Sequence, residues 1–308
     1  MTFPGDGQPP SGEQFEIGFG DYRAVITAIG ASLRLLQHKG RDLVVPFAVS
    51  ELRPAHRGAV MVPWPNRIVD GHYEFDGKSF QLPLSEPARG HAIHGLVDWA
   101  RFEPLKRSAN QVVLGYRLPA QKGYPFSLNV TVSYTLDAGG LRTEVVSRNT
   151  GTVPAPYGVA AHPYLVAGPG RVDDWELTLP AGDYLETAGE RLLPGEDRQV
   201  AGTAFDFRQR RVIGDTEMDH AFTRLDIDAA GDVRVAVNSP DGGGVELSFA
   251  RLGWVQVFTA DLPDPLVSRT GLAVEPMSCP PDAFNSGRDL DRLAAGADHS
   301  ASWRISAL

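Results

Sequence analysis

Cysteine is almost absent from this sequence of 308 residues, because Cys279 is the only one. A chain with one cysteine forms no internal disulfide. Such usage is typical of a reducing compartment, so we expect a cytoplasmic protein. Long apolar runs are also missing, since no stretch reaches the roughly eighteen consecutive apolar residues of a membrane-spanning helix. The sequence therefore predicts neither a disulfide framework nor a membrane span, and we interpret Cys279 as a packing residue.

Positive charge is in the minority, with 29 Lys and Arg residues against 38 Asp and Glu residues and a net charge of −9. This excess of negative charge disfavours nucleic acid or an anionic membrane as a partner. Nucleotide-binding signatures are lacking as well, because no Gly-x-Gly-x-x-Gly follows a predicted strand and no P-loop is present. A small molecule is the partner that we expect.

A secretory signal is not recognisable in the first twelve residues, which contain neither a basic segment nor an apolar one. We interpret residues 1–13 as a disordered leader. No internal repeat, low-complexity tract or long Pro/Ser linker divides the rest, and large β domains often exceed the usual single-domain size. Residues 14–308 are therefore expected to form one domain.

Helical periodicity is scarce, whereas strand signals recur at short spacing. Residues 128–136 alternate apolar and polar side chains, which predicts a strand with one exposed face. Asp76-Gly77 interrupts another strand pattern and is a strong β-hairpin signal. Residues 288–295 form at best a short helix. The sequence therefore predicts an all-β fold, a large antiparallel β-sandwich with few short helices.

One carboxylate stands out, because Glu275 follows a short apolar strand pattern and directly precedes Pro276. The residue before a proline is held in extended backbone, so we expect Glu275 to be fixed at the end of a strand. A carboxylate on a rigid β scaffold is suited to the role of general base. A solvated glutamate at a strand end is the alternative interpretation.

The same pattern delivers a histidine, because His162 follows an apolar segment and precedes Pro163. Ordinary pKa values of about 6.5 for histidine and about 4.3 for glutamate make His162 the natural acid and Glu275 the natural base. A hydrogen-bonded core histidine is the alternative. If the pair acts on a sugar, we expect the two side chains to lie about one pyranose apart and not in direct contact.

Two further segments contain polar residues suited to binding a sugar. In the segment Trp64-Pro65-Asn66-Arg67, the guanidinium of Arg67 offers a forked donor to hydroxyl or carboxylate oxygens, and Trp64 is able to stack on an apolar sugar face. Asp219 is able to accept a hydrogen bond from a hydroxyl. A surface loop with a core-packed tryptophan, and a turn-forming aspartate, are the alternatives.

Two histidines three residues apart, His91 and His94, invite comparison with a metal site. In an extended segment these positions face opposite sides, and no further cluster of ligands accompanies them, so we predict no metal site. His94 is followed by Gly95 and is better placed for the close approach of a ligand. The remaining histidines, His38, His56, His72 and His299, are interpreted as surface residues.

Together and in this order, these segments resemble the aldose 1-epimerase (mutarotase) family. The motifs are Asn66-Arg67-Ile68 with the following Gly71-x-Tyr73-x-Phe75, Ile93-His94-Gly95, His162-Pro163-Tyr164, Asp219-His220-x-Phe222, and Glu275-Pro276 with Pro281-Asp282-Ala283-x-Asn285. The resemblance implies a β-sandwich of the galactose-mutarotase type with an open sugar cleft. It also implies no cofactor and no metal.

The resemblance further implies roles for individual residues. Glu275 would act as general base and His162 as general acid, while Arg67, His94 and Asp219 would bind and orient the sugar; we add Asn66 and Trp64 to the binding set. Pro63-Trp64-Pro65, His94-Gly95-Leu96 and Leu165-Val166 depart from the commonest galactose-mutarotase pattern. These variants look more like the bacterial subgroup that includes a sulfoquinovose-linked mutarotase.

Two other functions remain open at this point. A hexose-6-phosphate 1-epimerase on the same fold would need several arginines converging on the phosphate. A non-catalytic carbohydrate-binding protein would need the binding residues but not the Glu275/His162 pair. Either a monomer or a homodimer is compatible with the sequence.

Overall fold

The structure is a computed structural model, and it describes residues 7–308. Within these residues the chain is almost entirely β, and every strand pair within the sheets is antiparallel except for isolated bridges. The predicted all-β fold with few short helices is therefore confirmed. No helix in the described part of the chain is long and apolar enough to cross a membrane.

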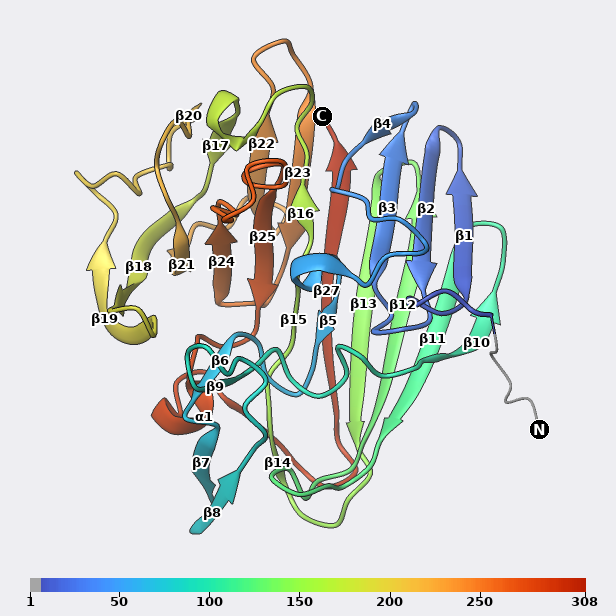
Figure 1. Cartoon of the computed structure of the whole chain (residues 1–308), viewed down its shortest axis with the longest axis vertical. Helices are drawn as coiled ribbons and strands as arrows, with labels where there is room; N and C mark the ends of the chain where they lie inside the picture. Colours follow the sequence, from blue (N-terminus) through green and yellow to red (C-terminus); the bar gives the residue numbers. More distant parts are fainter. Residues whose placement is uncertain (1–6) are drawn as a thin grey trace.

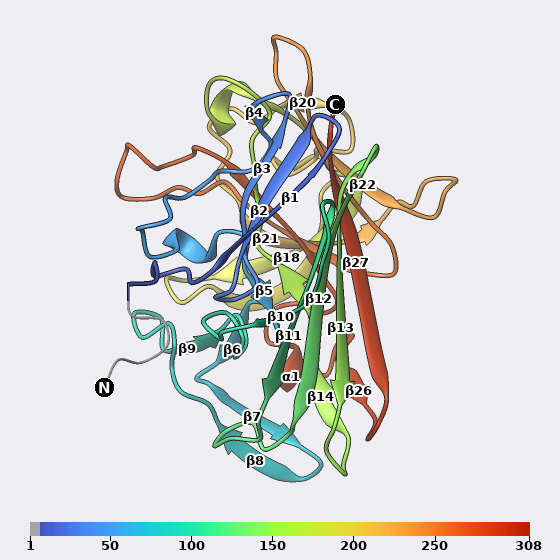
Figure 2. The same cartoon turned by 90° about the vertical axis from the view of Figure 1, so that its right-hand side faces the viewer.

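The larger sheet has nine strands, and its three ten-residue strands run side by side (Figure 2). In spatial order they are β10 (Glu103–Arg107), β11 (Gln111–Leu118), β12 (Leu128–Asp137), β13 (Gly140–Asn149), β27 (Asp298–Ala307), β23 (Gly244–Phe249), β22 (Val233–Asn238), β17 (Glu176–Thr178) and β20 (Arg211–Val212). Burial alternates along β12, as the period of two predicts, and β12 pairs with β13 without a register shift.

The second sheet has eight strands and lies on the left of Figure 1. Its path is β19 (Leu193–Gln199), β18 (Ala181–Ala188), β21 (Asp219–Leu225), β24 (Trp254–Phe258), β25 (Leu272–Met277), β15 (Ala160–Ala161) and β5 (Val60–Met61), with β16 (Tyr164–Leu165) also paired to β25. Several of its strands have only two residues, so this sheet is more often interrupted than the nine-stranded one.

Four smaller sheets and short helical segments complete the chain. The four-stranded sheet contains β1 (Gln14–Phe19), β2 (Tyr22–Thr27), β3 (Leu33–His38) and β4 (Arg41–Asp42), and it packs against β12 (Figure 1). The two-stranded sheets pair β14 (Ala155–Tyr157) with β26 (Asp291–Leu293), β6 (Arg67–Val69) with β9 (His91–Ile93), and β7 (His72–Phe75) with β8 (Lys78–Gln81). The helical segments are α1 (Ala283–Ser286) and the 3₁₀ turns Pro54–His56 and Val172–Asp174.

The hydrophobic core joins these layers, and the alternation of β25 and β24 decides what lies on each side of the second sheet. Val274 and Val257 are paired across the two strands, and both belong to the main core. Their neighbours Glu275 and Gln256 are also paired and point to the opposite face, because successive side chains of a strand alternate. That opposite face carries the candidate site.

Two local predictions fare differently. The Asp76-Gly77 turn does join β7 to β8. The short helix expected within residues 288–295 is wrong, because residues 291–293 form β26 and the helix lies earlier, at α1.

Of the predicted disordered leader, residues 1–6 lie outside the described residues. Within residues 7–13, Ser11 is buried and its carbonyl accepts a hydrogen bond from the N–H of Ile29.

Candidate active site

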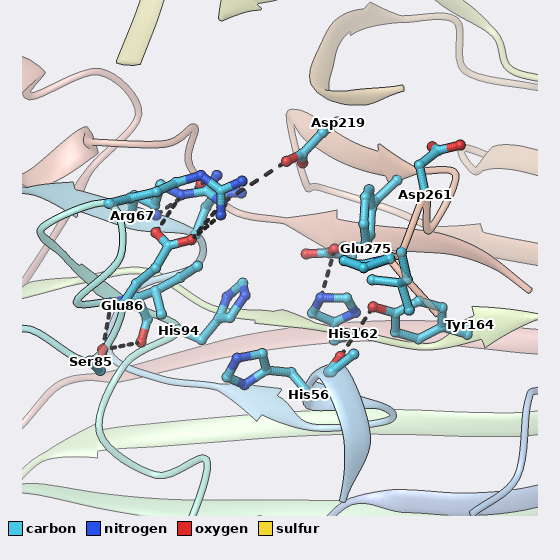
Figure 3. A pocket seen from close by; sticks show the side chains of 17 residues that line it. His56, Arg67, Ser85, Glu86, His94, His162, Tyr164, Asp219, Asp261 and Glu275 are labelled. Carbon is cyan, nitrogen blue, oxygen red and sulfur yellow. Dashed lines mark hydrogen bonds and ion pairs between the residues drawn. The ribbon is translucent and has the colours of Figure 1, made fainter. Parts of the chain in front are cut away.

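A polar cavity of about 500 Å³ opens beside β25, a size typical of small-molecule sites. Its wall combines carboxylates, imidazoles and guanidinium groups with a few apolar side chains. The polar lining residues are His56, Asn66, Arg67, Ser85, Glu86, Arg89, His94, His162, Tyr164, Asp219, Asp261 and Glu275 (Figure 3). All of the sequence-predicted site residues except Trp64 are therefore brought to one cavity.

Glu275 lies inside β25 and not at a strand end, which corrects the expectation from its proline neighbour. It is the fourth of six residues and is buried, with 2% of its surface exposed. Proline is tolerated next to it because residues 274–276 have no register partner on the β15 and β16 side. Pro276 therefore lies at a position of β25 where no backbone hydrogen bond to a strand on that side is needed.

His162 lies in that interruption, between β15 and β16. Its backbone N–H donates to Ala59 O at 3.0 Å, and its carbonyl accepts from the Gly58 N–H at 2.8 Å. The two bonds fix the segment while the side chain turns into the cavity beside Glu275 (Figure 3). Tyr164 follows two residues later on the same side of the chain, and its ring stacks on His162 with centroids 5.0 Å apart.

Glu275 and His162 are in direct contact, because His162 Nε2 and Glu275 Oε1 are 3.2 Å apart. The expectation of a gap of one pyranose between them is wrong for this structure. The two side chains are neighbours on one wall, so a sugar would lie against both and not between them. Both do face the same cavity, as an acid and a base for one substrate require.

Burial sets the protonation of this pair. It raises the pKa of Glu275 well above its ordinary value, with the nearby Asp219 adding to the rise and Arg67 opposing it. Burial also lowers the pKa of His162 well below its ordinary value, and His56 adds to the fall. Both shifts favour the uncharged forms. The two shifts therefore favour the form in which the shared proton lies on the carboxyl group.

Arg67, the first residue of β6, enters the cavity as a fixed cation. Its Nε donates to Glu86 Oε2 at 2.7 Å and its Nη2 to Glu86 Oε1 at 3.1 Å, a forked pair. Although burial opposes the charged form, the Glu86 and Asp219 carboxylates outweigh it and raise the pKa of Arg67. The neighbouring Asn66 accepts the Arg67 backbone N–H through Oδ1 at 2.9 Å, which fixes the turn.

Asp219 begins β21 and faces Arg67 across the cavity, with Oδ2 4.0 Å from Arg67 Nη2. Its Oδ1 accepts a hydrogen bond from Gln256 Nε2 at 2.7 Å. Gln256 in turn is paired in register with Glu275 on the next strand. One acceptor of Asp219 is thus occupied by the sheet, and the other is directed to the cavity.

His94 projects into the cavity and His91 does not, as the sequence predicts. His91 is buried and lies against the backbone of Arg191, with Nε2 3.0 Å from its carbonyl. His94 has a left-handed backbone with φ of 61°, and Gly95 after it has φ of 77°. A Cβ on Gly95 would lie 2.2 Å from Val62 O, so only glycine fits there. Among residues 7–308 no group of three metal-ligating side chains is gathered.

Comparison with known proteins identifies the fold and the sequence family together. The family described as "Aldose 1-epimerase" matches residues 13–306. The chain belongs to the aldose 1-epimerase family. Among its relatives, the uncharacterized protein YihR of Escherichia coli (strain K12) is 40% identical over 96% of this chain and 93% of its own length.

Other relatives are more distant. The galactose mutarotase of Rattus norvegicus is 32% identical over 68% of this chain and 65% of its own length. Among solved structures, an aldose epimerase homologue from C. elegans superposes with a TM-score of 0.85 at 21% identity, covering 96% of this chain and 98% of that chain. The likeness to that structure shows the same fold and confirms the expected galactose-mutarotase type of sandwich.

Trp64 does not line the cavity of this family member, which corrects its assignment as a binding residue. Only 2% of its surface is exposed, and its ring packs edge-on against Phe284 with centroids 5.6 Å apart. Trp64 is therefore a core-packed tryptophan, the alternative that the sequence also allowed. The two prolines that flank it hold a packing residue in place, and Asn66 and Arg67 follow directly into the site.

Sequence reasoning missed several polar residues of the site, among them His56, Ser85, Glu86 and Asp261 in the cavity wall and Gln256, which donates to Asp219. His56 was expected at the surface but lines the cavity. Glu86 lies in a loop without a motif, so no local signal marks it. Gln256 lies in a strand pattern, opposite Glu275 only because β24 and β25 pair in that register. The pairing of β24 with β25 within one sheet was the missing information.

Proposed function

We propose that this protein interconverts the α and β anomers of a free or sulfonated hexose, as a cofactor-independent mutarotase. The observation that carries the proposal is the Glu275–His162 contact at 3.2 Å in a polar cavity, with burial favouring the uncharged form of both. A buried acid–base pair that shares one proton is suited to moving that proton between two oxygens of one substrate.

The reaction follows from that shared proton. With the proton on His162, the Glu275 carboxylate takes the proton of the anomeric hydroxyl while His162 Nε2 protonates the ring oxygen. The bond between C1 and the ring oxygen breaks and C1 becomes an aldehyde. Rotation about the C1–C2 bond presents the other face of the carbonyl, and reclosure in the reverse sense gives the other anomer. The protein returns to its starting state.

Burial favours the protonation state that accompanies the open chain. After ring opening, Glu275 is a carboxylic acid and His162 a neutral imidazole, which is the combination that the desolvated pair adopts. The ion pair that begins the reaction needs extra polar contacts, and hydroxyl groups of a bound sugar supply them. Opening of the ring is therefore helped by the same low-dielectric surroundings that destabilise the ion pair.

The remaining wall suits a polyhydroxylated ligand. Arg67 is able to donate hydrogen bonds to a ligand, and Asp219 is able to accept them. His94 also lines the cavity, and burial lowers its pKa well below the ordinary value. Within residues 7–308, His94 Nδ1, His162 Nδ1 and Glu275 Oε2 are buried without a hydrogen-bond partner. Buried polar atoms of this kind are costly to the fold, and such groups are expected where a site needs them. These residues would hold and orient the sugar.

Charge balance disfavours a hexose 6-phosphate as substrate. The two guanidinium groups in the cavity wall, those of Arg67 and Arg89, both donate to Glu86. A phosphate dianion would have to compete with that carboxylate and with the charges of Asp219 and Asp261. A singly charged sulfonate makes a smaller demand, so sulfoquinovose stays within the proposed substrate range together with neutral hexoses.

The test is a polarimetric or NMR assay of anomer exchange with glucose, galactose, sulfoquinovose and glucose 6-phosphate, corrected for the spontaneous reaction. The variants Glu275→Gln and His162→Asn should each lower the enzymatic rate by about 10²–10⁴-fold, the range for positioned acid–base groups. His72→Asn, at an exposed position of β7, is the control. If Glu275→Gln exchanges anomers at the wild-type rate, the mechanism is wrong. Retained sugar binding without wild-type exchange would instead indicate a carbohydrate-binding protein.

A further inference from the structure

A third histidine enters the cavity from an unusual turn. Ala55 and His56 form part of the 3₁₀ turn Pro54–His56, and both have left-handed backbones, with φ of 44° and 55°. Consecutive non-glycine residues in this region are strained, and such strain persists only where the surroundings fix it. Tyr164, which stacks on His162, helps to fix it by donating its hydroxyl to Ala55 O at 3.1 Å. The strained turn is therefore anchored to the site.

Asp98, which is itself held by Arg53, sets the orientation of the His56 ring. Its Nδ1 lies 2.7 Å from Asp98 Oδ2, and the other oxygen of Asp98 accepts from the guanidinium of Arg53. The side chains of Asp98 and Arg53 are buried, with 9% and 2% exposed. Since an ionised carboxylate only accepts hydrogen bonds, Nδ1 carries the proton in this contact, and Nε2 is an acceptor in the neutral form of the ring. This is the carboxylate–histidine arrangement that fixes a tautomer.

The opposite edge of the ring faces the substrate space. His56 keeps 31% of its side chain exposed although its partner Asp98 is buried. Its ring centroid is 4.6 Å from that of His94 and 6.1 Å from that of His162, to which it is nearly parallel, with an interplanar angle of 22°. Figure 3 shows His56, His94 and His162 around one space, next to Glu275.

We propose that His56 is a further sugar-contacting residue, whose Nε2, aimed by Asp98, accepts a hydrogen bond from a hydroxyl group of the sugar. The inference rests on the proposed function and adds an acceptor to it. Some of the other acceptors of the wall are engaged already, because Glu86 binds two arginines and one oxygen of Asp219 accepts from Gln256. A hydroxyl close to His94 and His162 would find in His56 an acceptor that no protein donor occupies within residues 7–308.

The alternative is that His56 serves only the packing of Arg53 and Asp98. Two substitutions separate the roles, because an asparagine amide nitrogen takes the place of Nδ1 and a glutamine amide takes the place of Nε2. His56→Asn keeps the bond to Asp98 and removes the edge that faces the cavity. His56→Gln keeps a polar group at the cavity and removes the bond to Asp98. His72→Asn is the matched control on an exposed strand.

The experiment measures KM and kcat for anomer exchange, and sugar affinity by calorimetry in the Glu275→Gln background, where turnover is suppressed. Sugar contact predicts that His56→Asn unfolds like wild type but loses roughly tenfold in kcat/KM and in affinity, the size of one hydrogen bond. His56→Gln should recover part of that loss. A packing role predicts the reverse, with wild-type kinetics for His56→Asn and lowered stability for His56→Gln, and that result would overturn the proposal.

Two additional outcomes are informative. If the wild type binds sugar but does not exchange anomers, the proposed function fails, and a tenfold weaker affinity of His56→Asn would still support the contact. If neither variant folds, the nitrogen resonances of histidine in the labelled wild type provide the answer. A shift of His56 Nε2 on addition of sugar supports the contact. Shifts of His94 and His162 with none at His56 contradict it.

Discussion

The two main sheets of this protein differ in how regular their strands are. In the nine-stranded sheet, β12, β13 and β27 each run for ten residues, and β13 keeps an unbroken register with both neighbours. In the eight-stranded sheet, β5, β15 and β16 have two residues each. The regular sheet is a scaffold, and the interrupted sheet carries the candidate site.

One difference lies in what β12 and the cavity face of the eight-stranded sheet bury. Along β12 the buried positions are apolar, so burial and stability coincide. On the outer face of the eight-stranded sheet, Glu275, Gln256 and His162 are buried polar residues. Polar groups placed there weaken the fold and are expected where a site needs them. Substitutions in the first sheet should therefore change stability alone, and substitutions in the second should change stability and activity in opposite or unequal ways.

The largest effect on stability is expected in the scaffold. Leu247 in β23 is completely buried in the main core, so Leu247→Ala should lower the free energy of unfolding by about 2–5 kcal/mol. The anomer-exchange rate of the folded fraction should stay at the wild-type value, because the residue does not line the cavity. Urea denaturation and polarimetry on the same samples measure both quantities. A fall in kcat of the folded protein would show that a substitution in the nine-stranded sheet does alter the candidate site.

At the site, Gly95→Ala should have the next largest effect. A methyl group there would meet Val62 O at 2.2 Å in a left-handed backbone, so we expect a loss of about 2 kcal/mol in stability. His94, the preceding residue, should shift with the backbone and lower kcat/KM. Gly77→Ala is the control, because its φ of 70° is similar but no atom lies within 4 Å of the added carbon. Equal kinetics for the two variants would contradict the proposed placement of His94.

The same contrast explains what the sequence could predict. The fold class and the hairpin at Asp76-Gly77 follow from period-two alternation and turn chemistry, which are local properties. For Glu275 and His162, the motif order placed the residues in one cavity, but the distance between them depends on the interruption of β15 and β16. The position of each residue directly before a proline was therefore not enough to predict that the two side chains touch.

Contacts between residues far apart in the sequence were equally unpredictable. His56 is set by Asp98, 42 positions later, and Arg67 by Glu86, 19 positions later. Neither pair has a spacing that marks a contact on a strand or a helix. Trp64 shows the opposite error, because an aromatic residue beside a site motif is compatible with stacking on a sugar and with packing on Phe284. Only the burial of its ring decides between these.

Replacing the Glu275 carboxyl group with a neutral amide is expected to increase the stability of the fold at neutral pH. The pKa of Glu275 is raised in the folded protein, so between about pH 4.3 and that raised value the unfolded chain is ionised while the folded chain keeps its proton. Stability of the wild type therefore falls as the pH rises through this window. Glu275→Gln removes the loss, because its amide stays neutral and is still able to donate to His162.

We expect Glu275→Gln to unfold with nearly the wild-type free energy at pH 4, and to be more stable by about 1–2 kcal/mol at pH 7.5. Urea denaturation at both pH values measures this difference. The variant would then be more stable and much less active, a combination typical of catalytic groups. A stability difference that does not change with pH would contradict the raised pKa.

The smallest effect is expected for the carboxylate that holds Arg67. Burial raises the pKa of Glu86, but the hydrogen bonds and positive charges of Arg67 and Arg89 together outweigh burial and lower the pKa, so the group is ionised at neutral pH. In Glu86→Gln only one oxygen remains to accept from the guanidinium, and Arg67 becomes less well oriented. We expect KM to rise by about fivefold, which corresponds to about 1 kcal/mol, with little change in kcat, since Arg67 binds the sugar and moves no proton.

The exposed pair between Glu16 and Arg23 is the matched control for this change. It has the same forked geometry, with bonds of 2.8 and 2.9 Å, but 58% of the Glu16 side chain is exposed. Exposed pairs contribute about 0–1 kcal/mol, so Glu16→Gln should leave both KM and stability close to wild type. If Glu86→Gln behaves in the same way, the cavity does not depend on a fixed Arg67. In that case Asp219 and the histidines alone would have to orient the sugar.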